Sequence, residues 1–391
     1  MTATSPERGF PHAEYEARAE RAKARMAADD LDAIVVTSPP NVRYFSGFAS
    51  QFWESPTRPW FVIIPRSGDA ISVVPDIGAP AFEATWIDKI RSWPAPQPED
   101  DGVSLMADTL LGLPRTSGRI GWEMGSETII RMPIKDFDTL RSKVPGLEFV
   151  DGSPAIWSLR MVKSACEIGH LRHICQLASH AFEALPARLQ FGDSELTAAR
   201  KLSAELIERG ADSIPFIAAC SGPGGYDQII VGSRERPLDK GDILFMDLGA
   251  LYDGYSCDFD RNFAFGPLGN DAARAHNAVW QATEAGIRAA RPGATTTDLF
   301  RAMASVLESS GSQGLNVGRL GHGLGMQLTE PPSNRPGDDT PLVPGMVMTI
   351  EPGMEYAPGK MIVHEENVVI TEDGCELLTR RAPREMPVIS G

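Results

Sequence analysis

ILFMDLGALYDGYSCDFDR, residues 243–261, is the stretch that decides the fold of the C-terminal half of the chain. Apolar residues lead up to Asp247, and aromatic and apolar residues resume at Tyr255. Between them Asp253-Gly254 is a strong turn signal, because both residues tolerate the backbone angles of a tight hairpin turn. The stretch therefore predicts two antiparallel β-strands joined by a short loop.

Two pairing registers are open for this hairpin. A loop centred on Tyr252 and Asp253 places Asp247 opposite Asp258, whereas a two-residue loop at 253–254 places Asp247 opposite Asp260. Either register puts the three carboxylates on one face, because side chains alternate along a strand. Like charges opposite each other destabilise a sheet unless something neutralises them. A bound cation would do so, and the alternative is a sheet edge open to water.

One histidine and two glutamates lie in comparable settings farther along the chain. His322 stands between two glycines, where backbone crowding is low. Glu351 ends an apolar strand, and Glu365 lies inside the apolar run Ile362–Ile370. Buried carboxylates need a cationic partner, and no basic residue is regularly spaced to serve both strands. Four carboxylates and one imidazole suit Mn, Fe, Co or Zn, and two such ions could activate water for hydrolysis.

Composition bounds the class of protein. With 391 residues, 42% apolar and 23% charged, the chain is expected to be globular and to form two domains. The formal charge of -15 argues against a nucleic-acid partner, because phosphate binding needs clustered Lys and Arg. Five widely spaced cysteines and the lack of an 18-residue apolar run predict a cytoplasmic protein without a membrane partner.

The pattern of predicted secondary structure changes after Ser153-Pro154. Residues 1–155 alternate helical and strand patterns, with strands near 33–36, 60–65, 70–75, 119–122 and 147–150, which predicts an α/β domain. Residues 156–391 begin with one long predicted helix over 157–185 and form the second domain. Further helices are expected at 194–209, 271–290 and 297–309, and further strands at 215–219, 243–248, 346–350 and 362–370.

In this order the motifs resemble those of the pita-bread metallopeptidases, which comprise Xaa-Pro aminopeptidases, prolidases and methionine aminopeptidases, with creatinase as a relative. The resemblance covers nearly the whole chain, because 40–48 looks like the N-terminal domain of the Xaa-Pro and creatinase branch. The remaining matching motifs are Met246-Asp247-Leu248-Gly249-Ala250, Gly254–Arg261, Gly321-His322-Gly323-Leu324-Gly325, Ile350-Glu351-Pro352-Gly353 and Glu365-Glu366 followed by Thr371-Glu372-Asp373-Gly374.

The resemblance implies an α/β N-terminal domain (1–155) followed by an α+β pita-bread catalytic domain (156–391) with two divalent metal ions, Mn foremost. Asp247 would bind one ion, Asp258 and Glu365 would bridge both, and His322 and Glu351 would complete the other. The resemblance also favours the register with Asp258 opposite Asp247. It implies a homodimer that cleaves an amide bond in a short peptide by a metal-bridging hydroxide, with Glu351 and His322 as catalytic residues.

Two departures from the family put standard Xaa-Pro cleavage in question. Where the peptidases carry a histidine after the glycine-rich loop, this chain has Thr329, which cannot replace an imidazole. A second expected histidine is missing from 224–229, where Tyr226 stands instead. Tyr226, Thr329 and His364 are the candidate substrate-binding residues here, although alternation should point His364 away from Glu365.

The loop 51–60 supplies further candidates, because it is rich in aromatic residues and proline. Arg58 could hold a carboxylate, and Trp53 and Trp60 could contact an apolar or cationic group. The alternative is that these aromatic residues cover the sheet. For the whole chain, the alternatives to a peptidase are a small-molecule C–N hydrolase, a metal-dependent lyase on the same fold, and a catalytically silent binding module.

Overall fold

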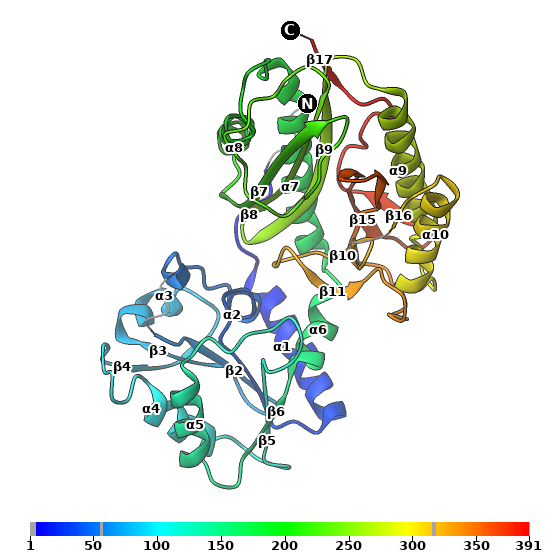
Figure 1. The fold of residues 1–391 in the computed structure, drawn as a ribbon. Helices are drawn as coiled ribbons and strands as arrows, with labels where there is room; N and C mark the ends of the chain where they lie inside the picture. Colours follow the sequence, from blue (N-terminus) through cyan, green and yellow to red (C-terminus); the bar gives the residue numbers. More distant parts are fainter. Residues whose placement is uncertain (1–4, 55–57, 315–317, 391) are drawn as a thin grey trace. The chain divides into compact units, whose positions relative to one another are not determined.

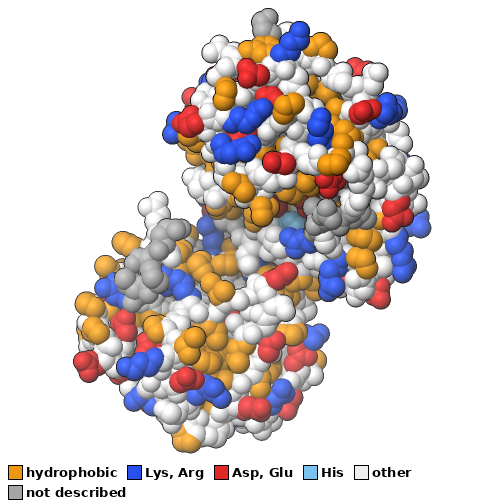
Figure 2. All heavy atoms as spheres, in the orientation of Figure 1, with side chains coloured by type: hydrophobic (Ala, Val, Ile, Leu, Met, Phe, Trp, Pro, Cys, Tyr) orange, Lys and Arg blue, Asp and Glu red, His pale blue; other side chains and the backbone are white. Residues whose placement is uncertain are grey.

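The computed structural model describes residues 5–54, 58–314 and 318–390, and these divide into two compact units. The N-terminal unit comprises residues 7–160. The C-terminal unit comprises residues from 161 onward together with Ser5 and Pro6. Within the described residues, no helix is both long enough and apolar enough to cross a lipid bilayer. Figure 2 shows charged side chains of both signs interspersed over the face in view.

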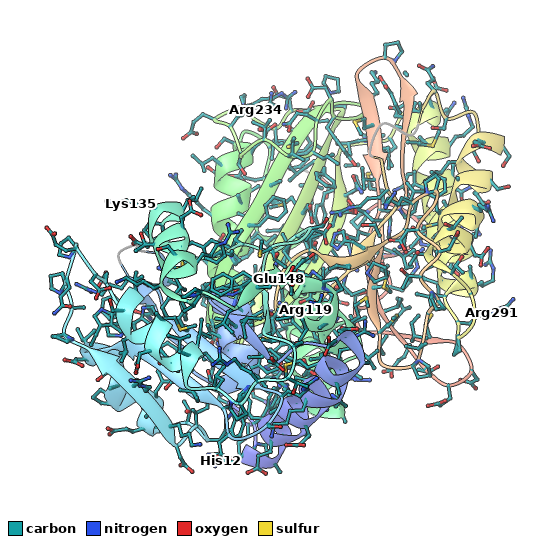
Figure 3. The ribbon with its side chains drawn as sticks, turned by 90° about the horizontal axis from the view of Figure 1, so that it is seen from below. His12, Arg119, Lys135, Glu148, Arg234 and Arg291 are labelled. Carbon is teal, nitrogen blue, oxygen red and sulfur yellow. The ribbon has the colours of Figure 1, made fainter. Side chains whose placement is uncertain are left out.

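A six-stranded mixed sheet organises the N-terminal unit. The strand order is β4-β3-β2-β1-β5-β6, and the β1–β2 and β2–β3 pairs are antiparallel, whereas the other pairs are parallel. Figure 3 labels Arg119 and Glu148, which come from adjacent strands and pair at 3.8 Å. The strands are β1 (Ala33–Val36), β2 (Phe61–Pro65), β3 (Ile71–Pro75), β4 (Lys89–Trp93), β5 (Arg119–Trp122) and β6 (Glu148–Asp151).

Helices cover this sheet, and their side chains form the core with the strands. Trp122 packs its ring against Phe137 and Phe149 at centroid distances of 5.1 and 5.0 Å. The helices are α1 (His12–Asp29), α2 (Pro39–Ser46), α3 (Ala79–Glu83), α4 (Val103–Leu111), α5 (Ile134–Lys143) and α6 (Ser153–Arg160). The α/β architecture expected for this half of the chain is present (Figure 1).

The single helix predicted over 157–185 is wrong. The chain instead forms α6 (Ser153–Arg160) and α7 (Ala165–Ala184). Ser164 starts the second helix, because its hydroxyl accepts the Glu167 backbone N–H while the Glu167 carboxylate accepts the Ser164 N–H, a capping box. The predicted boundary after residue 155 therefore falls inside α6.

The described residues of the C-terminal unit form two larger sheets, a β-hairpin and four long helices (Figure 1). One sheet has the order β17-β9-β8-β7, and the other has the order β11-β10-β12-β15-β16. Helices α7 and α8 pack on the first sheet, and α9 packs on strands β12 to β14. The helices are α7, α8 (Glu195–Arg209), α9 (Asn270–Ala289) and α10 (Thr296–Ser309). The strands are β7 (Ser213–Pro223), β8 (Asp242–Tyr252), β9 (Tyr255–Phe265), β10 (His322–Gly323), β11 (Glu330–Ser333), β12 (Val347–Ile350), β13 (Gly353–Ala357), β14 (Lys360–Val363), β15 (Glu366–Ile370), β16 (Cys375–Leu377) and β17 (Val388–Ile389).

The β8–β9 hairpin closes with a two-residue loop. Tyr252 pairs with Tyr255, and Asp253 and Gly254 between them have φ angles of 50° and 80°. Two consecutive positive φ angles are typical of the hairpin turn that Asp-Gly favours. Asp247 consequently lies opposite Asp260, and Asp258 lies opposite Gly249. The register that the family resemblance favoured is wrong, and the register set by the turn itself is correct.

The run 362–370, predicted as one strand, is interrupted. Strand β14 ends at Val363, β15 begins at Glu366, and His364 donates its backbone N–H to Pro352 O at 3.1 Å. The interruption leaves His364 and Glu365 at the junction of the β13–β14 hairpin with the five-stranded sheet. This junction gives Glu365 its position in the site described next.

Candidate metal centre

Five side chains of the types expected for metal ligands line one pocket of about 640 Å³ in the C-terminal unit. They come from segments far apart in sequence but adjacent in the fold. Asp247 and Asp258 come from β8 and β9, His322 from β10, Glu351 from the end of β12, and Glu365 from the β14–β15 junction. The structure thus brings together all five residues that the sequence singled out.

Three of the five are close enough to hold one ion. Ligand atoms of Asp258, His322 and Glu365 all lie within 4.8 Å of one another, and all three residues are buried. His322 Nε2 lies 3.4 Å from Asp258 Oδ2, while its Nδ1 lies 2.9 Å from the backbone oxygen of Gly323. A carbonyl beside Nδ1 fixes the proton there, so Nε2 is left as a ligand atom facing the pocket.

The backbone around these residues is tightly held. His322 donates its backbone N–H to Thr349 Oγ1 at 3.1 Å. Gly321 precedes it with φ +117° and lies so close to the Thr349 carbonyl that a Cβ would collide with it. Across the site, the backbone N–H of Asp258 donates to Asn367 Oδ1 at 3.1 Å, and the Asn367 amide donates to Asp258 O. These bonds fix the ligand geometry before any ion binds.

The buried carboxyl groups of this site have raised pKa values in the absence of a metal ion. Burial, and then mutual repulsion, raises the pKa of Asp247 and of Glu365 well above the usual carboxyl range, and burial does the same for Asp258. Burial raises the pKa of Glu351 to about 7, although the nearby His322 opposes the rise. Asp247 Oδ1 and Glu365 Oε1 have no hydrogen-bond partner within the described residues.

These properties fit divalent cations. Buried carboxylates that repel one another, two of which have an oxygen without a donor, need positive charge, and one imidazole among oxygen ligands suits borderline ions. A cation would favour the ionised form of each carboxylate and so reverse the pKa shifts. The residues present therefore fit a metal centre.

Asp260 is an additional acid at this centre. It is 1% exposed, lies opposite Asp247, and neither of its carboxylate oxygens has a hydrogen-bond partner among the described residues. Burial and the charge of Asp247 raise its pKa well above the usual range. The sequence predicted that Asp260 lies on the same face of the hairpin as Asp247 and Asp258, but it assigned no role to Asp260.

The pocket wall contains Arg319, which the sequence reasoning missed. Its guanidinium contacts Thr329 Oγ1 at 3.3 Å and Ser333 Oγ at 3.5 Å, and its charge opposes the rise that burial causes in the pKa of Asp258 and Glu351. A lone arginine in a loop carries little signal in a sequence. Only the fold places it beside the acids.

Thr329 lines the pocket as expected, and a buried ion pair fixes the loop that carries it. Glu330 pairs with Lys163 Nζ at 3.0 Å, both side chains being at most 2% exposed, and also accepts the Gln327 backbone N–H. A hydroxyl therefore occupies a fixed place in the pocket wall beside the acids.

Two other candidate substrate residues lie elsewhere. The Tyr226 hydroxyl donates to Asn262 and accepts the Val363 N–H at 2.6 Å, so this buried side chain packs in the core and does not line the pocket. His364 points to the opposite side of the chain from Glu365, because neighbouring extended residues alternate, and lines a different cavity. Neither side chain lines the metal pocket, as alternation predicted for His364, and their contact with substrate stays a prediction.

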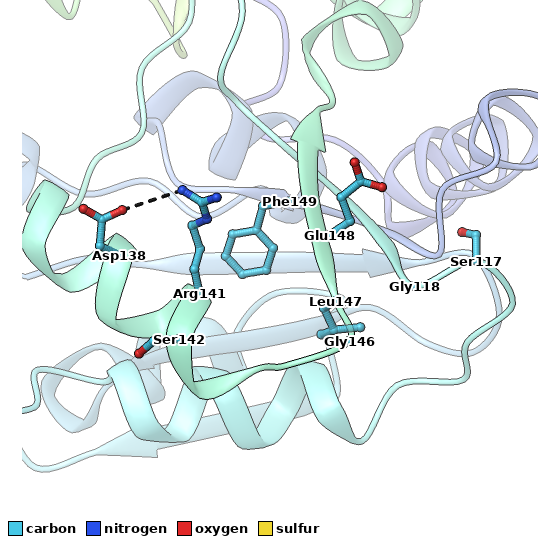
Figure 4. Close-up of a pocket in the computed structure, with 9 residues that line it drawn as sticks. All are labelled: Ser117, Gly118, Asp138, Arg141, Ser142, Gly146, Leu147, Glu148 and Phe149. Carbon is cyan, nitrogen blue, oxygen red and sulfur yellow. Dashed lines mark ion pairs between the residues drawn. The ribbon is translucent and has the colours of Figure 1, made fainter.

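The three candidates from loop 51–60 belong to the N-terminal unit. Trp60 is buried and stacks on Phe48 at 4.8 Å, and Trp53 packs against both rings. Arg58 is partly buried, and residues 55–57 of the loop lie outside the described residues. The aromatic residues thus form a packed cluster, and their contact with substrate stays a prediction. A separate hollow of this unit, near Arg141 and Phe149, contains an Asp138–Arg141 ion pair (Figure 4).

Comparison with known proteins agrees with this geometry. Residues 169–372 match the model of metallopeptidase family M24, and residues 18–162 match the creatinase/prolidase N-terminal domain. The chain belongs to metallopeptidase family M24. The predicted two-part fold and the family resemblance are thereby confirmed, and this M24 metallopeptidase is a metal-dependent peptidase whose family implies divalent metal ions.

Similar proteins span nearly the full length of this M24 metallopeptidase. A probable dipeptidase PepE from Mycobacterium bovis is 28% identical, with 98% of each chain covered. A Xaa-Pro dipeptidase from Pyrococcus furiosus is 25% identical, covering 93% of this chain and 97% of the relative. The crystal structure of dipeptidase PepE from Mycobacterium ulcerans superposes with a TM-score of 0.85 at 29% identity, covering 97% of this chain and 99% of the other.

Proposed function

We propose that this metallopeptidase is a dipeptidase that uses two divalent ions held by Asp247, Asp258, His322, Glu351 and Glu365. The observation that carries the proposal is the single pocket in which these five residues and Arg319 are all lining groups. A dipeptide offers both a carbonyl for the ions and a terminal carboxylate for the arginine. The names of the similar proteins, dipeptidase and Xaa-Pro dipeptidase, support this substrate class.

Arg319 is our candidate for binding the substrate carboxylate. Its contacts within the described chain are long ones to hydroxyl groups, at 3.3 and 3.5 Å, so its guanidinium remains able to accept a stronger partner. In a dipeptide the terminal carboxylate is one residue from the scissile amide. The enzyme would therefore distinguish dipeptides from longer peptides by the charge at this position.

Glu351 is our candidate for moving a proton. Its carboxylate lines the pocket beside the other four ligands, so it can accept a proton from water that the bound ions acidify and return it to the product. Thr329, at the place of the family histidine, can donate a hydrogen bond to substrate but cannot act as a base. The bound ions would supply Lewis acidity and acidify water. We propose manganese, because four of the five ligands are carboxylates.

The decisive experiment is a substrate screen of the metal-reconstituted enzyme. Dipeptides, with and without proline in the second position, would be compared with the same dipeptides as C-terminal amides. Arg319→Ala should raise KM for the free acids by about 10- to 100-fold, corresponding to the ~1.5–3 kcal/mol of a charge-assisted hydrogen bond, and should leave the amides unchanged. Arg291→Ala, at an exposed residue outside the pocket (Figure 3), is the matched control.

Measuring the metal content of the purified protein distinguishes a metal-dependent peptidase from a catalytically silent binding module. Asp258→Ala should lose bound metal by elemental analysis and lose activity together. If Asp258→Ala keeps both metal and activity, the proposed centre is wrong. Turnover of small amides or elimination from a zwitterion, with no dipeptide cleaved, would instead favour the C–N hydrolase or the lyase.

We further propose a cytoplasmic homodimer. All five cysteines are free, which suits a reducing compartment, and the resemblance to prolidases supports the dimer. Size-exclusion chromatography with light scattering would measure the oligomeric state directly.

A further inference from the structure

A second cavity of about 310 Å³ lies in the C-terminal unit, apart from the metal pocket. No described residue lines both cavities. Phe182, Phe263 and three prolines give it apolar walls, and its volume is at the lower end of the roughly 300–1,000 Å³ typical of ligand pockets. The prolines are Pro186, Pro383 and Pro387.

A buried histidine with unused hydrogen-bonding capacity faces this cavity. His276, on α9, is 5% exposed, and neither ring nitrogen has a hydrogen-bond partner among the described residues. Burial, together with the charge of Arg381, lowers the pKa of His276 to about 4, although the nearby backbone of Arg384 opposes the shift. The ring is therefore neutral at pH 7 and offers one N–H donor. The backbone of Arg384 lies near a ring nitrogen without forming a well-aligned hydrogen bond, so the His276 N–H can turn to a stronger acceptor in the cavity.

Positive charge gathers at the same end of the cavity. The His276 and His364 rings are 6.1 Å apart, and Arg381 Nη1 lies 3.4 Å from His364 Nε2. Arg261 and Arg380 also line the cavity, whereas Glu183 is its one acidic lining residue among those described. The arginines already pair with carboxylates, so their N–H groups are occupied, and they would act on a ligand only through their electrostatic potential. Because Glu183, Glu284 and Glu366 offset much of the arginines' charge, the His276 N–H is the group that favours an anion over a cation here.

We propose that this cavity binds a small monocarboxylate with an apolar body, such as an aromatic or branched aliphatic acid. The carboxylate accepts the His276 N–H in the field of Arg381 and Arg261, and the apolar body packs against Phe182, Phe263 and the prolines. A neutral hydrocarbon would leave His276 without a partner. A phosphate would leave the apolar wall unfilled.

The cavity wall is also joined to the metal centre. Arg261 Nη1 donates to the backbone oxygen of Glu365 at 3.0 Å, and Arg261 and Arg381 both pair with Glu366 at 3.1 Å. Binding must therefore be measured together with metal content. The measurement must also distinguish this cavity from direct ligation of a carboxylate to the ions.

The test is isothermal titration calorimetry of the metal-loaded protein with phenylacetate and 4-methylpentanoate, against phenethylamine and benzyl alcohol. Both acids should bind at least about tenfold more tightly than the amine and the alcohol. His276→Phe fills the cavity, and Ala382→Leu fills it from another wall without changing the histidine. Each should weaken binding at least about tenfold with metal content unchanged. His180→Gln is the control, because His180 lies on α7 but does not line the cavity.

Two results would overturn the proposal. One is no measurable heat for either acid at millimolar concentration. The other is binding of equal strength in wild type, His276→Phe and Ala382→Leu, which would place the acid at the metal ions. If His276→Phe does not fold, Ala382→Leu decides the question by the same comparison.

Discussion

Replacing Asp260 by asparagine tests whether its carboxylate is as isolated as the structure indicates. Asp260 is buried, and its two oxygens lack hydrogen-bond partners among the described residues. In the metal-free protein a neutral isostere removes the repulsion from Asp247 and the need to bury a charge. A buried polar group without a partner costs ~1–3 kcal/mol, and a charged one costs more. Asp260→Asn should therefore stabilise the metal-free protein at pH 8 by about 1–3 kcal/mol.

Asp242 provides the opposite control on the same hairpin. It is 2% exposed, but it pairs with Arg236 at 2.7 and 2.9 Å and accepts the Asp239 N–H. Asp242→Asn weakens a bidentate ion pair, so it should destabilise the protein by ~1–3 kcal/mol after allowance for the partly exposed arginine. Replacement by asparagine should thus stabilise the protein at Asp260 and destabilise it at Asp242, although both aspartates are buried in the same hairpin.

The assay is thermal unfolding of chelator-treated protein, with residual metal measured in each sample. Each kcal/mol should shift Tm by roughly 2–4 °C for a unit of this size. Because the folded-state pKa of Asp260 is raised, wild type loses stability as pH rises above its unfolded value. The advantage of Asp260→Asn should therefore be largest at pH 8 and fade toward pH 4. A lowered Tm for Asp260→Asn in verified metal-free protein would refute the reasoning.

Three further predictions concern Glu351, Glu195 and Glu123. Because burial raises the pKa of Glu351 to about 7, the free energy of unfolding of the metal-free wild type should fall by up to about 3 kcal/mol between pH 4.5 and 7. In Glu351→Gln, the free energy of unfolding measured with denaturant should change less over this pH range. Burial would raise the pKa of Glu195, but hydrogen bonds from Arg234 (Figure 3) and Ser221 outweigh it and lower that pKa. Glu195→Gln should therefore lower the free energy of unfolding, measured in urea, by ~1–3 kcal/mol at pH 7 and by much less at pH 3. Equal losses at both pH values would contradict this prediction. Glu123 accepts the backbone N–H groups of residues 37 and 38, so Glu123→Gln should cost ~1–3 kcal/mol and increase proteolysis of the N-terminal unit, whereas Glu127→Gln should not.

The sequence predicted most elements because their patterns are local. Strands 33–36 and 119–122 were predicted at their observed bounds, and helix 194–209 to within one residue. The long helix over 157–185 failed because the capping box at Ser164 was overlooked in a continuous helical pattern. Helix α2 was not among the predicted helices, because Pro39 and Pro40 are typical of a turn that ends the strand 33–36, although proline is well accepted in a first helical turn.

The metal centre was predictable because charges inside apolar strands are conspicuous. Asp247, Asp258, Glu351 and Glu365 each interrupt or end such a strand, so the pattern alone marks them. The pocket wall was less predictable. Arg319 comes from an ordinary loop, and Tyr226 was a candidate substrate residue whose hydroxyl the fold instead places on Asn262 and Val363. Side chains that act through distant neighbours leave no local signature.

The two-residue turn at Asp253-Gly254 has a consequence for how this gene can vary. Most surface turns accept a change of length, since a longer loop costs little entropy. Here one inserted or deleted residue that shifted the pairing by one position would turn Asp258 and Asp260 to the other face of the sheet. The strands could still pair, but the ligands would point away from His322. Among natural or laboratory variants, the length of this turn should therefore be fixed even where its residue types change.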